Sequence, residues 1–444
     1  MISYNKKRYI VLLLYASLTI TFLATFKIRL VRANNIVYIK PNGEIYPSNV
    51  PITNVSNVYY VFTSNINASI IVEKSGIILD GAGYKLERPG NRVGINLTRV
   101  TNVTIKNMEI KGFNEGVRLY NSSNNCIVNN NITACSWYAV FAIWSSNNII
   151  SGNVISNNGA GIWLKGLSNN NIINGNNILG SNYNGIGLSG VSGNSVFQNT
   201  ISNNSIGIWI KLSSYNNAVI RNIIANSSVC GLLLKESSNN LIYHNNFENN
   251  ANQVDSDFSQ NFWDDGYPSG GNYWSDHLGA DLDGDGICNA IYFINENNTD
   301  RYPLAAPIFA FKSGVWENMV YYVEIISNST ISDFNFSSED ASLVFNVKSA
   351  EGNAVFCRVR IPKRILWTTN DEWNISMNGE VITNYKVIPD KNYTYLYFAC
   401  NHIGKTVIIR GTGAIPEFSD ILVLSLFLLF AIVTVLAKRR IHLT

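Results

Sequence analysis

The stretch that decides the fold is residues 125–158, NCIVNNNITACSWYAVFAIWSSNNIISGNVISNN. It belongs to an internal repeat of 23 residues. One asparagine opens each copy, at Asn102, Asn125, Asn148, Asn171, Asn194, Asn217 and Asn240. A second follows five residues later, at Asn107, Asn130, Asn153, Asn176, Asn199, Asn222 and Asn245. Apolar residues align two and seven residues after the first asparagine, beginning at Ile127 and Ile132, so four columns share one period.

Each copy is built from short strands. Segments such as Gly161–Lys165 and Gly207–Lys211 alternate with period two, whereas a helical repeat would space apolar residues by about 3.6. Stacked coils place equivalent side chains about 4.8 Å apart, where asparagine amides bond to one another. The sequence therefore predicts an all-β fold, a right-handed single-stranded parallel β-helix of about 23 residues per coil. A leucine-rich array or a β-propeller lacks its signature here.

The pattern divides the chain into five parts. We expect a signal peptide or N-terminal anchor at 1–33, the β-helix with its N-terminal cap at 34–260, and a C-terminal cap at 261–310. The 23-residue period is absent from 311–413, where alternating runs and the hairpin signal Asn378-Gly379 predict a small antiparallel β-sandwich that serves as a stalk. Residues 414–444 complete the chain as linker, transmembrane helix and basic tail.

One flank of the predicted solenoid is aromatic and basic. Strand alternation directs two columns outward, the first with Arg118, Trp163, Trp209 and Leu233 and the second with Tyr120, Trp144, Lys165, Lys211 and Lys235. Flat rings stack on sugar faces and lysines attract acidic groups. We therefore predict a glycan-binding site formed by Trp144, Trp163, Lys165, Trp209, Lys211 and Lys235. Alternatively, these residues cover a lateral sheet face or contact the downstream domain.

An acidic loop in the C-terminal cap has the pattern of a calcium loop. Carboxylates occupy positions 1, 3 and 5, glycine occupies position 6, and a backbone carbonyl and an amide oxygen fall at positions 7 and 9. Position 12 is Tyr292, so Asp276 or Asp300 would have to complete the site. Without a cation, the carboxylates repel one another. We predict a structural calcium ion held by Asp281, Asp283, Asp285, Ile287 and Asn289.

Both ends of the chain carry membrane-targeting patterns. Lys6-Lys7-Arg8 precede an apolar stretch that ends near Phe26, and Val31-Arg32-Ala33 offers a cleavage site, although basic residues beyond the stretch leave an uncleaved anchor open. Residues 421–437 are apolar and precede Lys438-Arg439-Arg440, the pattern of a membrane span with a cytoplasmic tail. We expect a cell-membrane protein whose bulk lies outside the cell.

Composition supports export and argues against nucleic acid. Asn-x-Ser/Thr glycosylation acceptors occur at Asn54, Asn67, Asn96, Asn102, Asn121, Asn131, Asn203, Asn226, Asn297, Asn328, Asn335, Asn374 and Asn392, although a chain this rich in Asn and Ser produces some by chance. The net charge is only +3, and no Lys/Arg run lies outside the two ends. The electrostatic basis for nucleic-acid binding is therefore missing.

The repeats, over about residues 70–250, resemble the NosD-type periplasmic β-helices and the wider carbohydrate-binding and sugar-hydrolase β-helix group. The segment at 261–276, with its paired Gly and Trp residues, is similar to the tail that follows such repeats in many archaeal surface proteins. Residues 411–418 and the apolar tail resemble archaeal Pro-Glu-Phe sorting signals, which implies exchange of the tail for a lipid as an alternative to a retained anchor. These resemblances imply fold and location more than activity.

Three functions follow, in decreasing order of support. We expect a surface β-helix that binds glycans or serves as a structural or interaction module with other surface proteins. The alternative is a polysaccharide-active lyase, hydrolase or epimerase, which needs paired carboxylates or a calcium-supported base in one groove. Acids of the repeats fall in different columns, at Glu109, Glu115, Glu236 and Glu248. Copper-site maturation, implied by the NosD resemblance, is least favoured because the four histidines are scattered.

Overall fold

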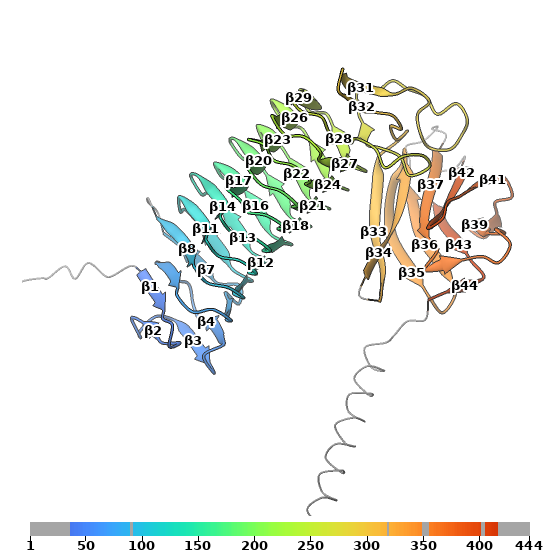
Figure 1. Ribbon diagram of the computed structural model, residues 1–444. Coiled ribbons are helices and arrows are strands. Elements are labelled where there is room, and N and C mark those ends of the chain that lie inside the picture. The colour runs from blue at the N-terminus through green and yellow to red at the C-terminus, as the bar shows by residue number, and fades with distance from the viewer. Residues whose placement is uncertain (1–35, 89–91, 318, 349–354, 401–404, 416–444) are drawn as a thin grey trace, which may run out of the picture.

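The computed structural model describes residues 36–88, 92–317, 319–348, 355–400 and 405–415. Figure 1 shows a solenoid of stacked coils with a β-sandwich at its C-terminal end. Every regular element in the described chain is a strand, so the predicted all-β class is confirmed. The described part has no helix long and apolar enough to cross a membrane. The predicted signal segment and the apolar tail lie outside the described residues.

The solenoid is a parallel β-helix of the right-handed type, as predicted, and it has about nine coils. Its strands form three sheets, which are parallel except for the antiparallel strands β2 and β3 in the N-terminal cap. Sheet 1 contains, in spatial order, β2 (Ile45–Tyr46), β1 (Ile36–Ile39), β5 (Ser69–Val72), β8 (Val93–Thr98), β11 (Glu115–Tyr120), β14 (Tyr138–Ile143), β17 (Ala160–Lys165), β20 (Asn184–Ser189), β23 (Ile206–Lys211), β26 (Cys230–Lys235) and β29 (Val254–Asp257). Sheet 2 contains β27 (Leu241–Tyr243), β24 (Ala218–Ile220), β21 (Ser195–Phe197), β18 (Ile172–Asn174), β15 (Ile149–Ser151), β12 (Cys126–Val128), β9 (Thr104–Lys106), β6 (Ile78–Asp80), β4 (Tyr59–Phe62) and β3 (Ile52–Val55). Sheet 3 contains β30 (Tyr273–Trp274), β28 (Asn246–Glu248), β25 (Ile223–Ala225), β22 (Thr200–Ser202), β19 (Asn177–Leu179), β16 (Val154–Ser156), β13 (Asn131–Thr133), β10 (Glu109–Lys111) and β7 (Lys85–Glu87).

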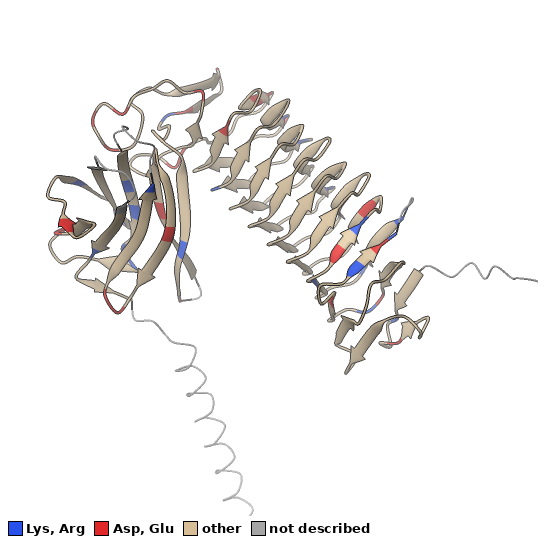
Figure 2. Cartoon of the chain, turned by 180° about the vertical axis from the view of Figure 1, so that it is seen from behind, with Lys and Arg blue, Asp and Glu red and all other residues tan. Residues whose placement is uncertain are grey.

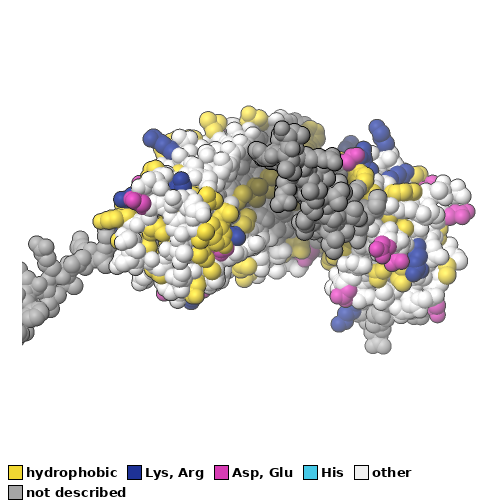
Figure 3. Space-filling view, turned by 90° about the horizontal axis from the view of Figure 1, so that it is seen from below, with side chains coloured by type: hydrophobic (Ala, Val, Ile, Leu, Met, Phe, Trp, Pro, Cys, Tyr) yellow, Lys and Arg dark blue, Asp and Glu magenta, His cyan; other side chains and the backbone are white. Residues whose placement is uncertain are grey.

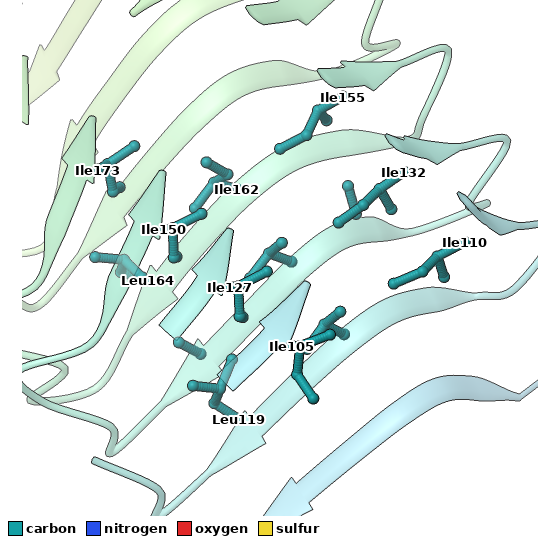
Figure 4. Close-up of a cluster of buried hydrophobic side chains, with 14 of the residues drawn as sticks. Ile105, Ile110, Leu119, Ile127, Ile132, Ile150, Ile155, Ile162, Leu164 and Ile173 are labelled. Carbon is teal, nitrogen blue, oxygen red and sulfur yellow. The ribbon is translucent and has the colours of Figure 1, made fainter. Parts of the chain in front are cut away.

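The middle residue of each short strand points into the coil. On sheet 2 this position is Ile105, Ile127, Ile150 and Ile173 in successive coils, all fully buried. Figure 4 shows these side chains in file, with a second file from sheet 3 beside them. Burial of one such side chain contributes about 2 kcal/mol, so the core supplies most of the stabilisation of the stack.

Asparagine columns hold the corners between the sheets, as predicted. Asn125 donates from its backbone N–H and from Nδ2 to Oδ1 of Asn148, at 2.9 and 3.1 Å. Asn148 makes the same two bonds to Asn171, at 2.8 and 3.0 Å. The column continues to Asn261, and the parallel column that starts at Asn130 ends at Asn272. Each buried amide therefore satisfies a main-chain donor of the preceding coil, which no other group could reach.

Asn102 and Asn107 were expected in these columns, and this expectation is wrong. The coil from β9 to β12 has 22 residues instead of 23, as the pairing of Thr104 with Cys126 shows. Val103 and Met108 therefore occupy the first positions of the two columns. Their main-chain N–H groups donate hydrogen bonds to Oδ1 of Asn125 and of Asn130. Asn102 and Asn107 lie at the adjacent corner positions, with φ of 56° and 54°.

The sequence also contains a third polar column that the 23-residue spacing of asparagine did not single out. It alternates asparagine with other residues at the corner between sheets 3 and 1. The Oδ1 atoms of Asn158, Asn204 and Asn250 accept the N–H groups of Cys135, Ser181 and Ser227, at 2.8 to 2.9 Å. Buried amides thus hold two corners of the solenoid in successive coils and the third corner in alternate coils.

Two antiparallel sheets of five strands form the sandwich. Sheet 4 contains β33 (Ile308–Trp316), β34 (Met319–Ser327), β37 (Val355–Pro362), β42 (Tyr393–Cys400) and β41 (Tyr385–Pro389). Sheet 5 contains β35 (Thr330–Ser337), β36 (Ser342–Lys348), β43 (Lys405–Arg410), β39 (Asn374–Met377) and β40 (Glu380–Val381). Two further pairs are β31 (Tyr292–Asn295) with β32 (Asn298–Asp300) and β38 (Leu366–Trp367) with β44 (Gly413–Ala414). One apolar core fills the space between sheets 4 and 5. The Asn378-Gly379 turn is confirmed, since Met377 pairs with Glu380 and both turn residues have positive φ.

The buried amide column gives a stability prediction. Asn171→Ala removes the acceptor for both bonds from Asn148 and leaves a buried N–H without a partner. The free energy of unfolding should fall by roughly 2–4 kcal/mol. Asn177→Ala on β19, whose side chain points outward, should change it by less than about 0.5 kcal/mol. Denaturant unfolding of the two variants measures this difference, and equal midpoints would contradict the structural role of the column.

Candidate functional sites

The outward face of sheet 1 carries the predicted aromatic and basic strip. Strand pairing places one column in the order Arg118, Phe141, Trp163, Gly187, Trp209 and Leu233. The next outward column runs Tyr120, Ile143, Lys165, Ser189, Lys211 and Lys235. The first column is thus as predicted, and the second is as predicted except at one position.

Trp144 is that exception, because Ile143 occupies its expected place. β14 ends at Ile143, and Trp144 takes the left-handed corner position with φ of 52°, where the preceding coil has Asn121. Its ring nevertheless packs edge-on against Tyr120, with centroids 5.3 Å apart, and is 48% exposed. Trp144 therefore borders the strip from the corner.

Trp163 and Trp209 form the centre of the strip although a whole coil separates their strands. Their ring centroids lie 5.8 Å apart at an interplanar angle of 90°. The intervening residue is Gly187, where a Cβ atom would come within 2.4 Å of the Trp163 ring. Glycine at this position lets the Trp163 ring lean across the gap, so the two indoles make one continuous half-buried surface.

A lysine ammonium group lies over this indole surface. Nζ of Lys211 is 3.5 Å from the Trp209 centroid and 5.0 Å from that of Trp163. Burial and the neighbouring Lys165 lower the pKa of Lys211. Neither lysine forms an ion pair with a carboxylate of the described residues. Their charge is thus available to an anionic group on a ligand.

Charged residues mark the two ends of the strip. At the N-terminal end Arg118 makes a two-pronged bond to Glu115, at 2.5 and 2.6 Å. At the other end Asp257 pairs in register with Lys235. Figure 2 shows that the coils between carry few charged residues on their strands. Among the described residues, no pair of carboxylates faces the middle of the strip.

Sheet 2 presents a different outer surface. Its outward side chains from β12 to β27 carry no charge, and Ile149, Ile172 and Leu241 are between 36% and 42% exposed. Figure 3, seen from below, shows apolar side chains grouped on the solenoid surface. Sheet 2 therefore lacks the basic and aromatic combination of sheet 1.

The acidic loop is the second site. Asp281, Asp283 and Asp285 each place a carboxylate oxygen within 4.8 Å of the others, the only such group of His, Cys, Asp and Glu in the described chain. The Asp281 carboxylate accepts the N–H groups of Asp285 and Gly286, at 3.0 and 2.8 Å. These bonds turn the loop around the three acids, whose spacing suits an oxygen-seeking cation.

The other predicted ligands are differently placed. Asn289 Oδ1 accepts the N–H of Leu282 at 2.7 Å, so this amide braces the loop. Ile287 is buried and donates its N–H to Asp285 Oδ1 at 2.9 Å. Neither candidate for the closing acid joins the group. Asp276 accepts a hydrogen bond from the hydroxyl of Tyr292. Asp300 is fully buried and accepts one from the indole N–H of Trp274 at 2.9 Å.

A third cluster joins the solenoid to the sandwich. Glu324 on β34 is 1% exposed and bonds to Arg221, to Arg360 at 2.6 Å and to Nδ1 of His244 at 3.3 Å. Arg221 and His244 occupy corner positions after β24 and β27, both with positive φ. Sequence reasoning missed this cluster, because its members come from distant segments without a common spacing.

The charges in this cluster determine its protonation. Burial alone would raise the pKa of Glu324, but Arg221, Arg360 and the His244 hydrogen bond hold it well below the ordinary value. Burial lowers the pKa of His244, and the Glu324 charge offsets this only in part. The stable arrangement is therefore a neutral histidine beside an ionised glutamate and two arginines.

These features define a class: a parallel β-helix with buried amide columns, capped by a sandwich. The model of the family NosD, described as "Periplasmic copper-binding protein (NosD)", matches residues 31–178 and 94–279, more than half of the chain. The chain therefore belongs to the NosD family. No protein of curated function matches it.

Several solved β-helix structures are similar over part of their length. A mutant of the periplasmic alginate epimerase AlgG matches with 18% identity and a TM-score of 0.36, over 53% of this chain and 70% of that one. An alginate lyase from Paenibacillus sp. matches with 15% identity and a TM-score of 0.27, over 47% and 91%. Tailspike protein 2 from Escherichia coli O157:H7 bacteriophage CAB120 matches with 11% identity and a TM-score of 0.38, over 79% and 61%.

The described side chains do not fit the copper of the family description. Copper prefers imidazole, thiolate and thioether ligands. His244 is enclosed by Glu324 and Ser269, and His277 bonds to the carbonyl of Ala290. Burial raises the pKa of the Cys135 and Cys230 thiols to about 12, which opposes thiolate formation. We derive no copper chemistry for this part of the chain.

The Glu324 cluster predicts that stability falls in mild acid. Since folded His244 has a lowered pKa, the unfolded chain takes up its proton below about pH 6.5 while the folded chain does not. Because the pKa of Glu324 is also lowered in the folded chain, the free energy of unfolding falls further below about pH 4.5. The slope reaches about 1.4 kcal/mol per pH unit for each group. His244→Gln should reduce the dependence of the thermal unfolding midpoint on pH between pH 5 and 7. If the dependence is unchanged in this variant, His244 is not its source.

Proposed function

We propose that this chain is a surface-displayed protein that binds glycans, acidic ones above all, along sheet 1. The observation that carries the proposal is the surface made by Trp163 and Trp209 with the Lys211 ammonium group over the Trp209 ring. Indole faces stack on the apolar faces of sugar rings, and the lysine supplies the charge for a carboxylate or sulfate.

The spacing of the coils supports an extended glycan chain. Successive strands of sheet 1 lie about 4.8 Å apart, so Lys165 and Lys211, two coils apart, are separated by roughly 10 Å at the backbone. This distance is close to the disaccharide repeat of an extended β-1,4-linked polysaccharide. A glycan lying along the solenoid axis would meet one tryptophan and one lysine on β17 and a second such pair on β23.

The alternative, that these residues are covered by the downstream domain, has less support. The contacts between solenoid and sandwich come from sheets 2 and 3 and from the cap, through Arg221, His244 and Asn246. Figure 1 places β33 and β34 beside β24 and β27, away from the strip on β17 and β23. The described part of the sandwich leaves the strip open to a ligand.

Export and anchoring belong to the same proposal. Its support is the basic and apolar N-terminal segment, the apolar stretch 421–437, and the basic residues after it. All thirteen asparagines of the glycosylation motifs are exposed, except the half-exposed Asn96, whereas the buried asparagines of the columns carry no such motif. We therefore propose a cell-membrane protein whose bulk lies outside the cell, facing cell-surface polymers and other surface proteins.

The glycan proposal predicts the effect of removing the indoles. Trp163→Ala with Trp209→Ala should weaken binding to an acidic polysaccharide by at least about tenfold, since each ring contributes about 1 kcal/mol beyond its buried area. Trp137→Ala is the matched control, because Trp137 is 55% exposed at the corner before β14, outside both columns. A glycan array followed by calorimetry on the full-length protein makes the measurement. Equal binding by both variants would refute the site.

Incubating the protein with the same polysaccharides separates binding from catalysis. A polysaccharide-active enzyme would release new reducing ends or unsaturated uronates from acidic or neutral polysaccharides. Binding without products supports the proposal, and products abolished by the double variant would replace it with the enzymatic alternative.

We also propose that the acidic loop binds calcium as a structural ion. The spacing of Asp281, Asp283 and Asp285 supports it. The loop touches the sandwich, since Lys386 Nζ approaches the Asp283 carbonyl at 3.4 Å and burial with the Asp281 charge raises the pKa of Tyr397. An ion here would relieve repulsion among the acids and lock the end of the β-helix.

Calcium should raise the thermal unfolding midpoint relative to chelator. At a hundredfold excess over the dissociation constant, one ion adds about 2.7 kcal/mol. Asp283→Asn should abolish this difference while leaving the loop bonds of Asp281 intact, because the exposed Asp283 carboxylate makes none of them. If chelator leaves the unfolding midpoint of the natural chain unchanged, the loop does not bind a stabilising calcium ion.

A further inference from the structure

β33 is an edge strand of sheet 4, paired only with β34. The carbonyl of Pro307, just before the strand, accepts the N–H of Ser327 at 3.1 Å, so this residue faces β34. Ile308 faces the opposite way, because its N–H donates to Oδ1 of Asn246 at 2.9 Å and its carbonyl accepts from Nδ2 of Asn246 at 3.0 Å. The Asn246 side chain thus forms with Ile308 the two hydrogen bonds that a neighbouring strand would form.

The rest of this edge has no such neighbour. Backbone groups alternate in direction along an antiparallel strand, so the N–H and carbonyl of Ala310 and Lys312 point the same way as those of Ile308. No turn, loop or side-chain group of the described chain bonds to them. The strand therefore offers two unpaired donor and acceptor sets, spaced as a partner strand requires.

This open edge lies in a cleft between the two bodies. The cleft holds about 280 Å³. Its sandwich wall is formed by Ile308, Phe309, Ala310, Phe311 and Ile331, and its solenoid wall by Gln198, Asn199, Thr200, Arg221 and Ile223. Phe309, Ala310 and Phe311 are half-exposed. The lining is mostly apolar, and it flanks a row of backbone hydrogen-bonding groups.

We propose that this cleft binds an extended peptide segment of another protein, which adds to sheet 4 as a strand beside β33. Exposed strand edges are templates for such addition, with main-chain bonds for affinity and side pockets for alternate side chains. Phe309, Phe311 and Ile223 would receive the apolar side chains. The binding is separate from the glycan strip, which lies on another sheet.

The edge also shows where the added strand stops. At one end Asn246 already occupies the pairing position of Ile308. At the other end the β33–β34 register shifts between Lys312 and Gly314, and such bulges end regular pairing. The site is therefore short, and the solenoid wall opposite it favours a single strand over the whole sheet of a second copy.

The test uses the full-length protein and a synthetic peptide of alternating valine and threonine, with the same peptide N-methylated at every residue as its control. The plain peptide should bind and slow amide hydrogen exchange over residues 308–312. The N-methylated peptide should not bind, because it lacks the donors that pairing requires. Fluorescence polarisation measures affinity, and mass spectrometry locates the protected amides.

Two variants assign the binding to the edge. Ala310→Pro removes the outward N–H, which proline tolerates on an edge strand, and should weaken binding by about tenfold. Glu380→Ala on β40, an exposed position at the edge of sheet 5, leaves β33 unchanged and should bind like the natural chain. Thermal unfolding checks that Ala310→Pro stays folded; if it unfolds, the N-methylated peptide decides.

Several results would overturn the proposal. These are equal binding of the N-methylated peptide, equal binding by a folded Ala310→Pro variant, or no peptide binding up to millimolar concentration. Protection of residues 308–312 by an acidic polysaccharide instead would make the cleft a glycan site. A concentration-dependent dimer that Ala310→Pro abolishes would assign the edge to a second copy.

Discussion

The structure depends on a buried side-chain amide that accepts a main-chain N–H from the neighbouring coil. At each corner the chain turns between two sheets, and the main-chain N–H of the turning residue has no partner on a neighbouring strand. An unpaired N–H in this dry interior would cost free energy at every coil. Asparagine in file solves the problem by repetition, because each Oδ1 serves the coil before it. Given these corners, the isoleucine files inside need only be apolar and regular.

The corners also supply the side chains that break the repeat. Trp144, Arg221 and His244 all have positive φ at corner positions. At the corner of Arg221 and His244, four earlier coils have asparagine or glycine, namely Asn107, Asn129, Gly152 and Gly175. A left-handed residue points its side chain away from the sheets, toward whatever lies beside the solenoid. Trp144 borders the aromatic strip in this way, and Arg221 and His244 reach Glu324 of the sandwich. The repeat thus fixes the backbone at each corner, and the side chains that differ from the repeat give each face of the solenoid its own contacts.

The candidate strip was predictable because it follows the period. Trp163, Trp209, Lys165 and Lys211 fall in the expected columns, since an outward position recurs with each strand of sheet 1. Two kinds of error remain. Asn102 and Asn107 were misplaced because the coil from Thr104 to Cys126 has 22 residues instead of 23. Trp144 was placed one residue too far, since Ile143 follows Tyr120 by the regular 23 residues.

By itself, the sequence determined the stacked strands, the amide columns, the composition of the sheet 1 surface and the acidic loop, because each is local or recurs at a fixed interval. Tertiary structure alone decided that Trp163 leans across Gly187 onto Trp209, that Glu324 collects Arg221, His244 and Arg360, and that the edge of β33 faces the solenoid. Such contacts join segments far apart in the chain. The first depends on the orientation of the Trp163 ring within the solenoid, and the other two depend on how the solenoid and the sandwich pack; no spacing in the sequence records that geometry.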